Sequence, residues 1–381
     1  MHHIILNTES YFGPGCVSMV GAEAVERDFK RAFIVTDETL VRFGTLRPVL
    51  ASLQASGVDH VIFDKVLSNP SIAAVQAGVA AFQKSDCDFI VAAGGGSPID
   101  LAKAVSVIAA NPEHIDVRSL EHTKQTRNRG VCLFAIPTTA GTASEVTVDY
   151  VITDEEHARK FLVADDNCIP RVAFIDAQMM AGMPQSLAAA TGMDALTHAI
   201  EAYLSRRAWT MTDIFALQAI ECIAKHLKHS CHREEARENM ALGQYLAGMA
   251  FSNCGLGATH ALAHPLSSVH NIPHGVANAI MLPHVMAFNA QMTGERYRDI
   301  AKAMGVRGTE NMRPEQYREA AIGAVRALAN LVSIPKGLAE LGVTRESIPQ
   351  MAALAVADAT APDNPRPLHT GNAEELYAKA F

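Results

Sequence analysis

The chain has 381 residues, of which 49% are hydrophobic and 19% charged, and its formal net charge is −8. This length exceeds what one hydrophobic core usually supports, so we expect two domains. The acidic balance and the lack of a basic cluster argue against nucleic acid or a membrane as the main partner. No secretory signal opens the chain and its seven cysteines form no Cys-x-x-Cys pair, so we expect a cytoplasmic protein with reduced thiols.

The first half of the chain alternates short β-branched runs with stretches of helical pattern. The runs typical of strands are 32–36, 60–64, 89–93, 132–136 and 172–176, and 73–82 and 98–109 are typical of helices. Strands and helices in alternation predict a mainly parallel sheet covered by helices. Such sheets bind ligands at the carboxyl ends of their strands, where turns meet helix N-termini.

After residue 184 the strand pattern stops. The segments that follow are rich in Ala, Leu, Glu and Met and predict helices over 186–204, 212–228, 233–251, 314–332 and 348–359. We therefore expect an α/β domain over 1–184 and an all-α domain over 185–381.

Asp37 ends the first predicted strand. A carboxylate at this point can accept hydrogen bonds from an adenosine ribose and repel a 2′-phosphate. It can equally serve as the N-cap of the helix that follows, and both roles can hold together.

Gly94, Gly95 and Gly96 follow an apolar strand and open a helix. The glycines allow positive φ and a close approach of the backbone to a ligand. Ser97 suits the N-cap and Pro98 the first helical position, so the free N–H groups would face a phosphate. A plain tight turn is the alternative, and the segment lacks the third glycine of the Gly-x-Gly-x-x-Gly fingerprint.

A second loop, 137–145, supplies several hydroxyls after another predicted strand. By itself it is typical of a turn that caps a helix. Two such loops after neighbouring strands favour a dinucleotide site more strongly than either loop does by itself.

In the second half, Asp194 and His198 are four residues apart, so one face of a helix presents both. His260 and His264 repeat this spacing, and His274 follows. One carboxylate with three imidazoles suits Fe²⁺ or Zn²⁺ and leaves positions open for substrate. A lone histidine on an apolar face is more often a core residue, and an Asp-x-x-x-His pair is often a cap.

The segment 239–294 strengthens the metal interpretation. It contains no Asp, Glu, Lys or Arg, yet it holds His260, His264, His270, His274 and His284. A stretch this long without charge is expected to be buried, and its polar residues interrupt every apolar run before it could span a bilayer. Buried neutral imidazoles need partners, and a metal ion can hold several at once. These patterns leave open which three histidines bind the ion.

At these motifs the chain resembles the iron-containing (group III) alcohol dehydrogenase family, over nearly its whole length. The segments that carry the resemblance are 94–100, 137–145, 189–198 and 257–289, and the blocks 240–245 and 273–278 favour the branch that interconverts lactaldehyde and 1,2-propanediol. The resemblance implies a Rossmann-like dinucleotide-binding domain, a helical metal-binding and substrate domain, and a homodimer.

The resemblance also assigns site residues. It implies Asp194, His198, His260 and His274 as metal ligands. His264 would lie beside them, near the nicotinamide, where it could pass a proton to solvent or serve only in packing. The positions that match those holding NAD(H) are Asp37, Asn69, Gly95, Gly96, Ser97, Thr138, Thr139, Thr142 and Lys160, with Asp149 close to the nicotinamide pocket.

Three residues depart from the pattern of that branch and leave its substrate open. Asp149 stands where the branch has Asn, His270 replaces an aromatic residue, and Thr360 replaces a Cys. A general short-chain primary alcohol dehydrogenase of the same family is therefore one alternative. A lyase of the dehydroquinate synthase type is another, but its phosphorylated substrate needs cations that 239–294 does not supply. A metal-storage or metal-sensing module would not need the dinucleotide loops. We expect a small, neutral aldehyde or alcohol as substrate.

Overall fold

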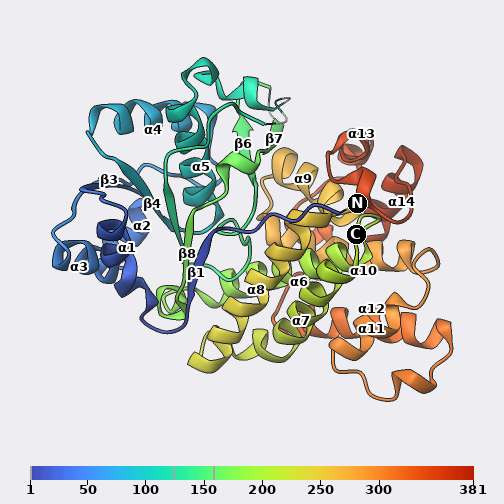
Figure 1. The fold of residues 1–381 in the computed structure, drawn as a ribbon. Coiled ribbons are helices and arrows are strands. Elements are labelled where there is room, and N and C mark those ends of the chain that lie inside the picture. The colour runs from blue at the N-terminus through green and yellow to red at the C-terminus, as the bar shows by residue number, and fades with distance from the viewer. Residues whose placement is uncertain (1, 122, 124, 158) are drawn as a thin grey trace. The chain divides into compact units, whose positions relative to one another are not determined.

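The computed structural model describes residues 2–121, 123, 125–157 and 159–381. By its contacts the chain divides into two compact units, shown as a ribbon in Figure 1. The first unit comprises residues 1–139 and 143–183, and the second comprises 140–142 and 184–381.

The first unit is built on a six-stranded sheet with the order β1-β8-β5-β4-β2-β3, and every neighbouring pair is parallel. The strands are β1 (Glu9–Phe12), β2 (Arg31–Val35), β3 (Asp59–Phe63), β4 (Phe89–Gly94), β5 (Leu133–Pro137) and β8 (Val172–Ile175). All five predicted strands are present, within one residue at each end. The edge strand β1 was not predicted, because it has only four residues and most of them are exposed.

Helices cover both faces of this sheet. They are α1 (Val20–Glu26), α2 (Glu38–Phe43), α3 (Arg47–Ala55), α4 (Ile72–Lys84) and α5 (Gly96–Ala110), with short 3₁₀ turns η1 (Cys16–Met19), η2 (Pro112–His114), η3 (Val117–Leu120), η4 (Asp166–Cys168) and η5 (Ala177–Met180). Alternate residues of β2 point to opposite faces. Phe33 belongs to the core with α4 and α5, whereas Ile34 belongs to the core with α1 and α3.

A separate hairpin of two antiparallel strands, β6 (Asp149–Asp154) and β7 (Arg159–Ala164), also belongs to the first unit. The sequence prediction missed it, because charged residues stand at the ends of its strands. Arg118 of η3 binds the buried Asp154 through two hydrogen bonds of 3.0 Å, which ties the hairpin to the preceding segment.

The second unit is mostly helical and contains no strand among its described residues, as predicted. Its helices are α6 (Gln185–Leu204), α7 (Thr210–His226), α8 (Glu234–Cys254), α9 (Ala258–His270), α10 (His274–Asn289), α11 (Arg296–Ala303), α12 (Pro314–Leu331), α13 (Ile348–Ala357) and α14 (Thr370–Lys379), with 3₁₀ turns η6 (Leu227–His229), η7 (Thr309–Asn311), η8 (Leu338–Leu341), η9 (Arg345–Ser347) and η10 (Ala361–Asp363). The five predicted helices are confirmed within three residues at each end.

The uncharged segment forms most of α8 and all of α9 and α10. Most of its residues are buried, as its composition predicts. Its helices contain Pro265 and Pro283, which made them hard to predict from propensity. Among the residues that the structure describes, no helix has the length and hydropathy needed to span a membrane.

Candidate metal centre and dinucleotide loops

Helix α6 supplies two of the candidate ligands from one face. Asp194 and His198 lie one helical turn apart and are both almost completely buried. Gly192 allows this burial, because a Cβ at this position would lie 2.1 Å from a side-chain carbon of Leu227. The sequence thus places two candidate metal ligands inside the helical core.

Helices α9 and α10 supply the other two candidate ligands. His260 lies in the first turn of α9, and His274 is the first residue of α10, directly after Pro273. Ligand atoms of Asp194, His198, His260 and His274 all lie within 4.8 Å of one another. Of the six histidines that the sequence left open, the structure therefore brings three together with the carboxylate.

Asn278, one turn after His274, contacts this cluster and was missed by the sequence analysis. Its amide nitrogen donates to Oδ1 of Asp194 at 2.7 Å, and it lies 3.1 Å from Nε2 of both His260 and His274. Both imidazoles thus present Nε2 toward the same carboxylate. The donor set of one carboxylate and three imidazoles fits a divalent first-row metal.

Glu201 was also missed, although its spacing was visible. It lies three residues after His198 and seven after Asp194, so it shares their face of α6. Its Oε2 accepts the Nδ1–H of His260 at 2.6 Å. This bond leaves Nε2 of His260 with its lone pair directed at the other candidate ligands.

The electrostatics of the cluster favour metal binding. Burial lowers the pKa of His198 to about 4, so its imidazole is neutral and able to bind a cation. Burial by itself would raise the pKa of Asp194, but His198, His274 and His260 together hold that pKa below its ordinary value. The cluster therefore combines an ionised carboxylate with a neutral imidazole.

His264 lies beside the cluster and outside the four-residue set. Its ring stacks on that of His274, with centroids 5.3 Å apart and planes 16° apart. Its Nδ1 donates to Oδ2 of Asp358 at 2.7 Å, and the other oxygen of Asp358 accepts the Thr360 hydroxyl at 2.6 Å. Thr360, which the sequence analysis noted only as a departure, therefore holds the carboxylate that orients His264.

The remaining histidines of the uncharged segment lie elsewhere. Nε2 of His270 lies 2.7 Å from the hydroxyl of Ser347. His284 is a half-buried residue of α10 whose pKa is lowered by burial. Neither belongs to the cluster.

The glycine-rich turn of the first unit starts its helix earlier than predicted. Helix α5 begins at Gly96 with Gly95 as its N-cap, so the prediction that Ser97 is the N-cap is wrong. None of the three glycines has positive φ. They permit close packing instead, since a Cβ at Gly94 would lie 2.4 Å from Pro98 and one at Gly95 would lie 3.3 Å from Thr139.

Three candidate cofactor residues meet beside this turn. The Ser97 hydroxyl accepts the backbone N–H of Asn69 at 3.2 Å, and the Asn69 side chain accepts a hydrogen bond from Lys160 at 2.8 Å. Asn69 has a φ of 59°, a left-handed conformation that a non-glycine residue rarely adopts. Burial lowers the pKa of Lys160 to about 8.

The other candidate cofactor residues are more widely spread. Asp37 follows β2 and caps α2 by accepting the N–H of Leu40 at 3.0 Å, which confirms the capping interpretation. Thr138 donates its N–H to the carbonyl of Gly94 at 2.9 Å, so the two loops are adjacent. Asp149 starts β6 opposite Ala164, whereas Lys160 pairs with Thr153 near the other end of the hairpin. Thr142 belongs to the second unit.

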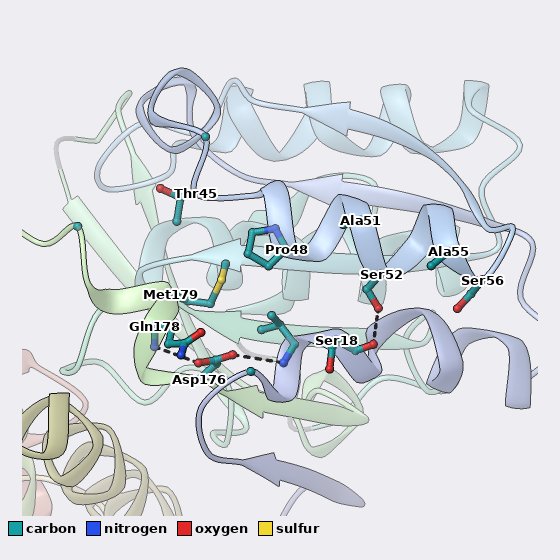
Figure 2. Close-up of a pocket in the computed structure, with 14 residues that line it drawn as sticks. Ser18, Thr45, Pro48, Ala51, Ser52, Ala55, Ser56, Asp176, Gln178 and Met179 are labelled. Carbon is teal, nitrogen blue, oxygen red and sulfur yellow. Dashed lines mark hydrogen bonds between the residues drawn. The ribbon is translucent and has the colours of Figure 1, made fainter.

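The first unit also contains a pocket of about 640 Å³ that includes none of the candidate residues (Figure 2). The side chains of Asp176 and Ser52 bond within the protein. Asp176 accepts the N–H of Gln178 at 2.9 Å, and the Ser52 hydroxyl donates to the carbonyl of Ser18 at 2.6 Å. Because these groups are already satisfied, the pocket does not indicate a particular ligand.

Comparison with known families agrees with this architecture. The model of the iron-containing alcohol dehydrogenases matches residues 7–177, and that of the C-terminal part of the Fe-containing alcohol dehydrogenase family matches residues 188–381. The chain belongs to the iron-containing alcohol dehydrogenase family and is an enzyme of that class. Membership implies iron and an NAD-type cofactor, and the four-residue cluster is a possible site for the metal.

Individual relatives are similar over nearly the full length. The chain is 51% identical over 381 residues to lactaldehyde reductase of Escherichia coli (strain K12), which covers 100% of both chains. It is 38% identical over 369 residues to the NAD-dependent methanol dehydrogenase of Bacillus methanolicus, which covers 96% of each. The crystal structure of a 1,3-propanediol oxidoreductase matches with a TM-score of 0.97 at 38% identity, over 100% of both chains.

Proposed function

We propose that this enzyme interconverts lactaldehyde and 1,2-propanediol with NAD(H) and a divalent metal, iron in the first place and zinc as a possible substitute. The observation that carries the proposal is the cluster of Asp194 and three histidines, two of which, His260 and His274, come from the segment 239–294 without formal charge. The 51% identity to a lactaldehyde reductase supports the choice of substrate within the family.

The residues of the cluster would hold the metal through one carboxylate and three imidazoles. A bound metal supplies a Lewis acid for the substrate oxygen, and the nicotinamide supplies or accepts the hydride. Asp194, His198, His260 and His274 keep their donor atoms converged because three packed helices carry them. In this proposal our predicted domain 185–381 binds the metal and the substrate.

His264 is the residue that we propose moves the proton. Its Nδ1–H is donated to Asp358, so Nε2 is the nitrogen that can accept a proton from an alcohol or a water. Asp358 is itself held by the hydroxyl and the N–H of Thr360, at 2.6 and 2.9 Å. The ring is thereby fixed beside His274 and available for proton transfer.

We propose that the predicted domain 1–184 binds the dinucleotide. The free N–H groups at the start of α5 and the adjacent Thr138–Thr139 segment suit a pyrophosphate. Asp37, which follows β2, would repel a 2′-phosphate and so favour NAD(H) over NADP(H). On the family resemblance, we also propose a homodimer in the cytoplasm.

The absence of Lys and Arg from the segment 239–294 supports a small, neutral substrate. An anionic substrate would be buried there without a matching cation, which costs several kcal/mol, on the order of the penalty for one unpaired ion. The alternative within the same family is a general dehydrogenase of short primary alcohols. It would accept 1-propanol as readily as 1,2-propanediol.

One steady-state assay tests the proposal. The purified, iron-loaded enzyme is given NADH with lactaldehyde, propanal and glyceraldehyde 3-phosphate, and NAD with 1,2-propanediol, 1-propanol and lactate. We expect the highest kcat/KM for lactaldehyde and 1,2-propanediol. Equal values for propanal and 1-propanol would favour the general dehydrogenase, and a preference for lactate or the phosphorylated aldehyde would refute the substrate assignment.

A further inference from the structure

The carboxylate of Glu201 joins the two helices that carry three of the candidate ligands. Glu201 is on α6, on the face that presents Asp194 and His198, and it is only 5% exposed. Its partners are on α9 and include the His260 ring. A carboxylate buried to this degree is costly unless it is fully hydrogen-bonded, so its contacts require an explanation.

Those contacts reach both the backbone and the side chain at the start of α9. Oε1 accepts the N–H of Thr259 at 2.6 Å, and Oε2 accepts the N–H of His260 at 3.4 Å. Oε2 also accepts Nδ1–H of the His260 ring at 2.6 Å. The N-cap residue of α9 is Gly257, which has no side chain to cap the helix. A Cβ at Gly257 would lie 3.0 Å from Oε1, so the glycine leaves room for the carboxylate.

Capping alone does not account for this arrangement. Asn364 already accepts the N–H of Ala258 in the same turn, at 3.1 Å, and it has no contact with the ring of His260 among the described hydrogen bonds. Glu201 differs from Asn364 in two respects, because it carries a negative charge and binds the imidazole directly. Through the bond to the imidazole, Glu201 acts on a candidate metal ligand as well as on the start of the helix.

We propose that Glu201 is a positioning residue of the metal centre. Its bond to Nδ1 fixes the tautomer and the ring orientation of His260, so that the lone pair of Nε2 meets the donor atoms of Asp194 and His274. A carboxylate in this position strengthens the imidazole as a donor. Together with Asp194 it also supplies two negative charges, which match one divalent cation. This inference rests on the proposed metal centre and adds a residue that binds no metal itself.

The test compares Glu201→Gln with Asn364→Ala. Glu201→Gln keeps the shape of the side chain but removes its charge. The new amide N–H₂ also faces one of the N–H donors whose hydrogen bond the carboxylate accepted. Asn364→Ala removes a hydrogen bond from the same helix start and leaves the bond between Glu201 and His260 intact. The full-length variants and the parent are titrated with Zn²⁺ and Fe²⁺ against a competing chelator, and thermal unfolding of each is recorded.

We expect Glu201→Gln to bind either metal about 10- to 100-fold more weakly than the parent, as is usual for the partner of a metal-binding histidine. We expect Asn364→Ala to lose thermal stability while its metal affinity stays within about threefold of the parent. The Co²⁺-substituted proteins provide a second readout, because their visible spectra report the geometry of the ligands and should change only in Glu201→Gln.

Either of two results would overturn the inference: an unchanged affinity in Glu201→Gln, or an equal loss in Asn364→Ala, which would mean that Glu201 is only a cap. If Glu201→Gln does not fold, Glu201→Asp takes its place, since the shorter carboxylate withdraws from Nδ1 and the same loss is expected. Failure of the parent itself to bind a divalent metal would instead refute the proposed metal centre.

Discussion

Gly275, next to the candidate ligand His274, provides a direct test of how closely α10 must approach α6. A Cβ at Gly275 would lie 2.3 Å from the carbonyl oxygen of Ala190 and 3.3 Å from the Cβ of Asp194. Real Cβ contacts are essentially never below 3.0 Å, so Gly275→Ala must separate the two helices by at least 0.7 Å, the difference between 3.0 and 2.3 Å. The clash is with backbone, which cannot rotate away as a side chain can.

The size of this displacement sets the expected loss. Metal sites tolerate ligand displacements of about 0.2 Å, so a shift of this size should weaken metal binding by at least about tenfold. Overpacking of this kind also destabilises the fold by ~1–3 kcal/mol. The matched control is Gly323→Ala, because a Cβ at this position of α12 has no atom within 4 Å. That substitution should leave metal binding unchanged and stabilise the protein by about 0.5–1 kcal/mol.

Metal affinity is measured by chelator competition, and the free energy of unfolding by urea denaturation with and without metal. The reasoning is refuted if Gly275→Ala binds metal as tightly as Gly323→Ala does. It is equally refuted if Gly275→Ala is more stable than the parent, since the helical propensity of alanine would then outweigh the proposed clash.

Three further substitutions test the other assignments. His274→Ala should remove bound iron and abolish activity, and full iron occupancy in this variant would show the ligand assignment to be wrong. Asp37→Gly should raise the ratio of NADP(H) to NAD(H) use at least about tenfold, since the like-charge contact with a 2′-phosphate costs several kcal/mol of binding free energy. Loss of the helix cap should lower the stability by only about a few tenths of a kcal/mol. An unchanged ratio would show that Asp37 does not contact the cofactor. Asp358→Asn should lower kcat by about tenfold or more with unchanged metal content, because the tautomer of His264 is then no longer fixed by a carboxylate. A kcat equal to that of the parent would mean that His264 serves only in packing.

The sequence predicted most of the architecture because its strands and helices carry strong local patterns. The β-branched runs of β2 and β4 and the Ala-rich α6 are recognisable without tertiary information. Strand β1, the hairpin of β6 and β7, and the helices α9 and α10 were among the elements missed. Strand β1 is short and exposed, and the strands of the hairpin have charged residues at their ends. Helices α9 and α10 each contain a proline, and histidine has poor helix propensity.

The candidate site was predictable to the extent that its residues share a helix. The four-residue spacing of Asp194 and His198 was visible, and Glu201 could have been added by extending that face to the next turn. Asp358 could not, because it lies 94 residues from His264 and only the folded chain brings them together. The N-cap of α5 was misplaced for a tertiary reason, since the Ser97 hydroxyl bonds to Asn69, which is distant in sequence, rather than to its own helix.

The short connection between α9 and α10 limits the insertions and deletions that this region can tolerate. Helix α9 ends at His270 and α10 begins at His274, so only residues 271–273 connect them. Asn271 has a φ of 54°, and Pro273 fixes the direction in which α10 starts. One residue inserted or deleted in a connection of three residues would shift the start of α10 by up to about 3.3–3.6 Å, the length that one extended residue spans. Since His274 is the first residue of α10 and its ligand atom lies within 4.8 Å of that of Asp194, this short connection should reject insertions and deletions that an ordinary surface loop accepts.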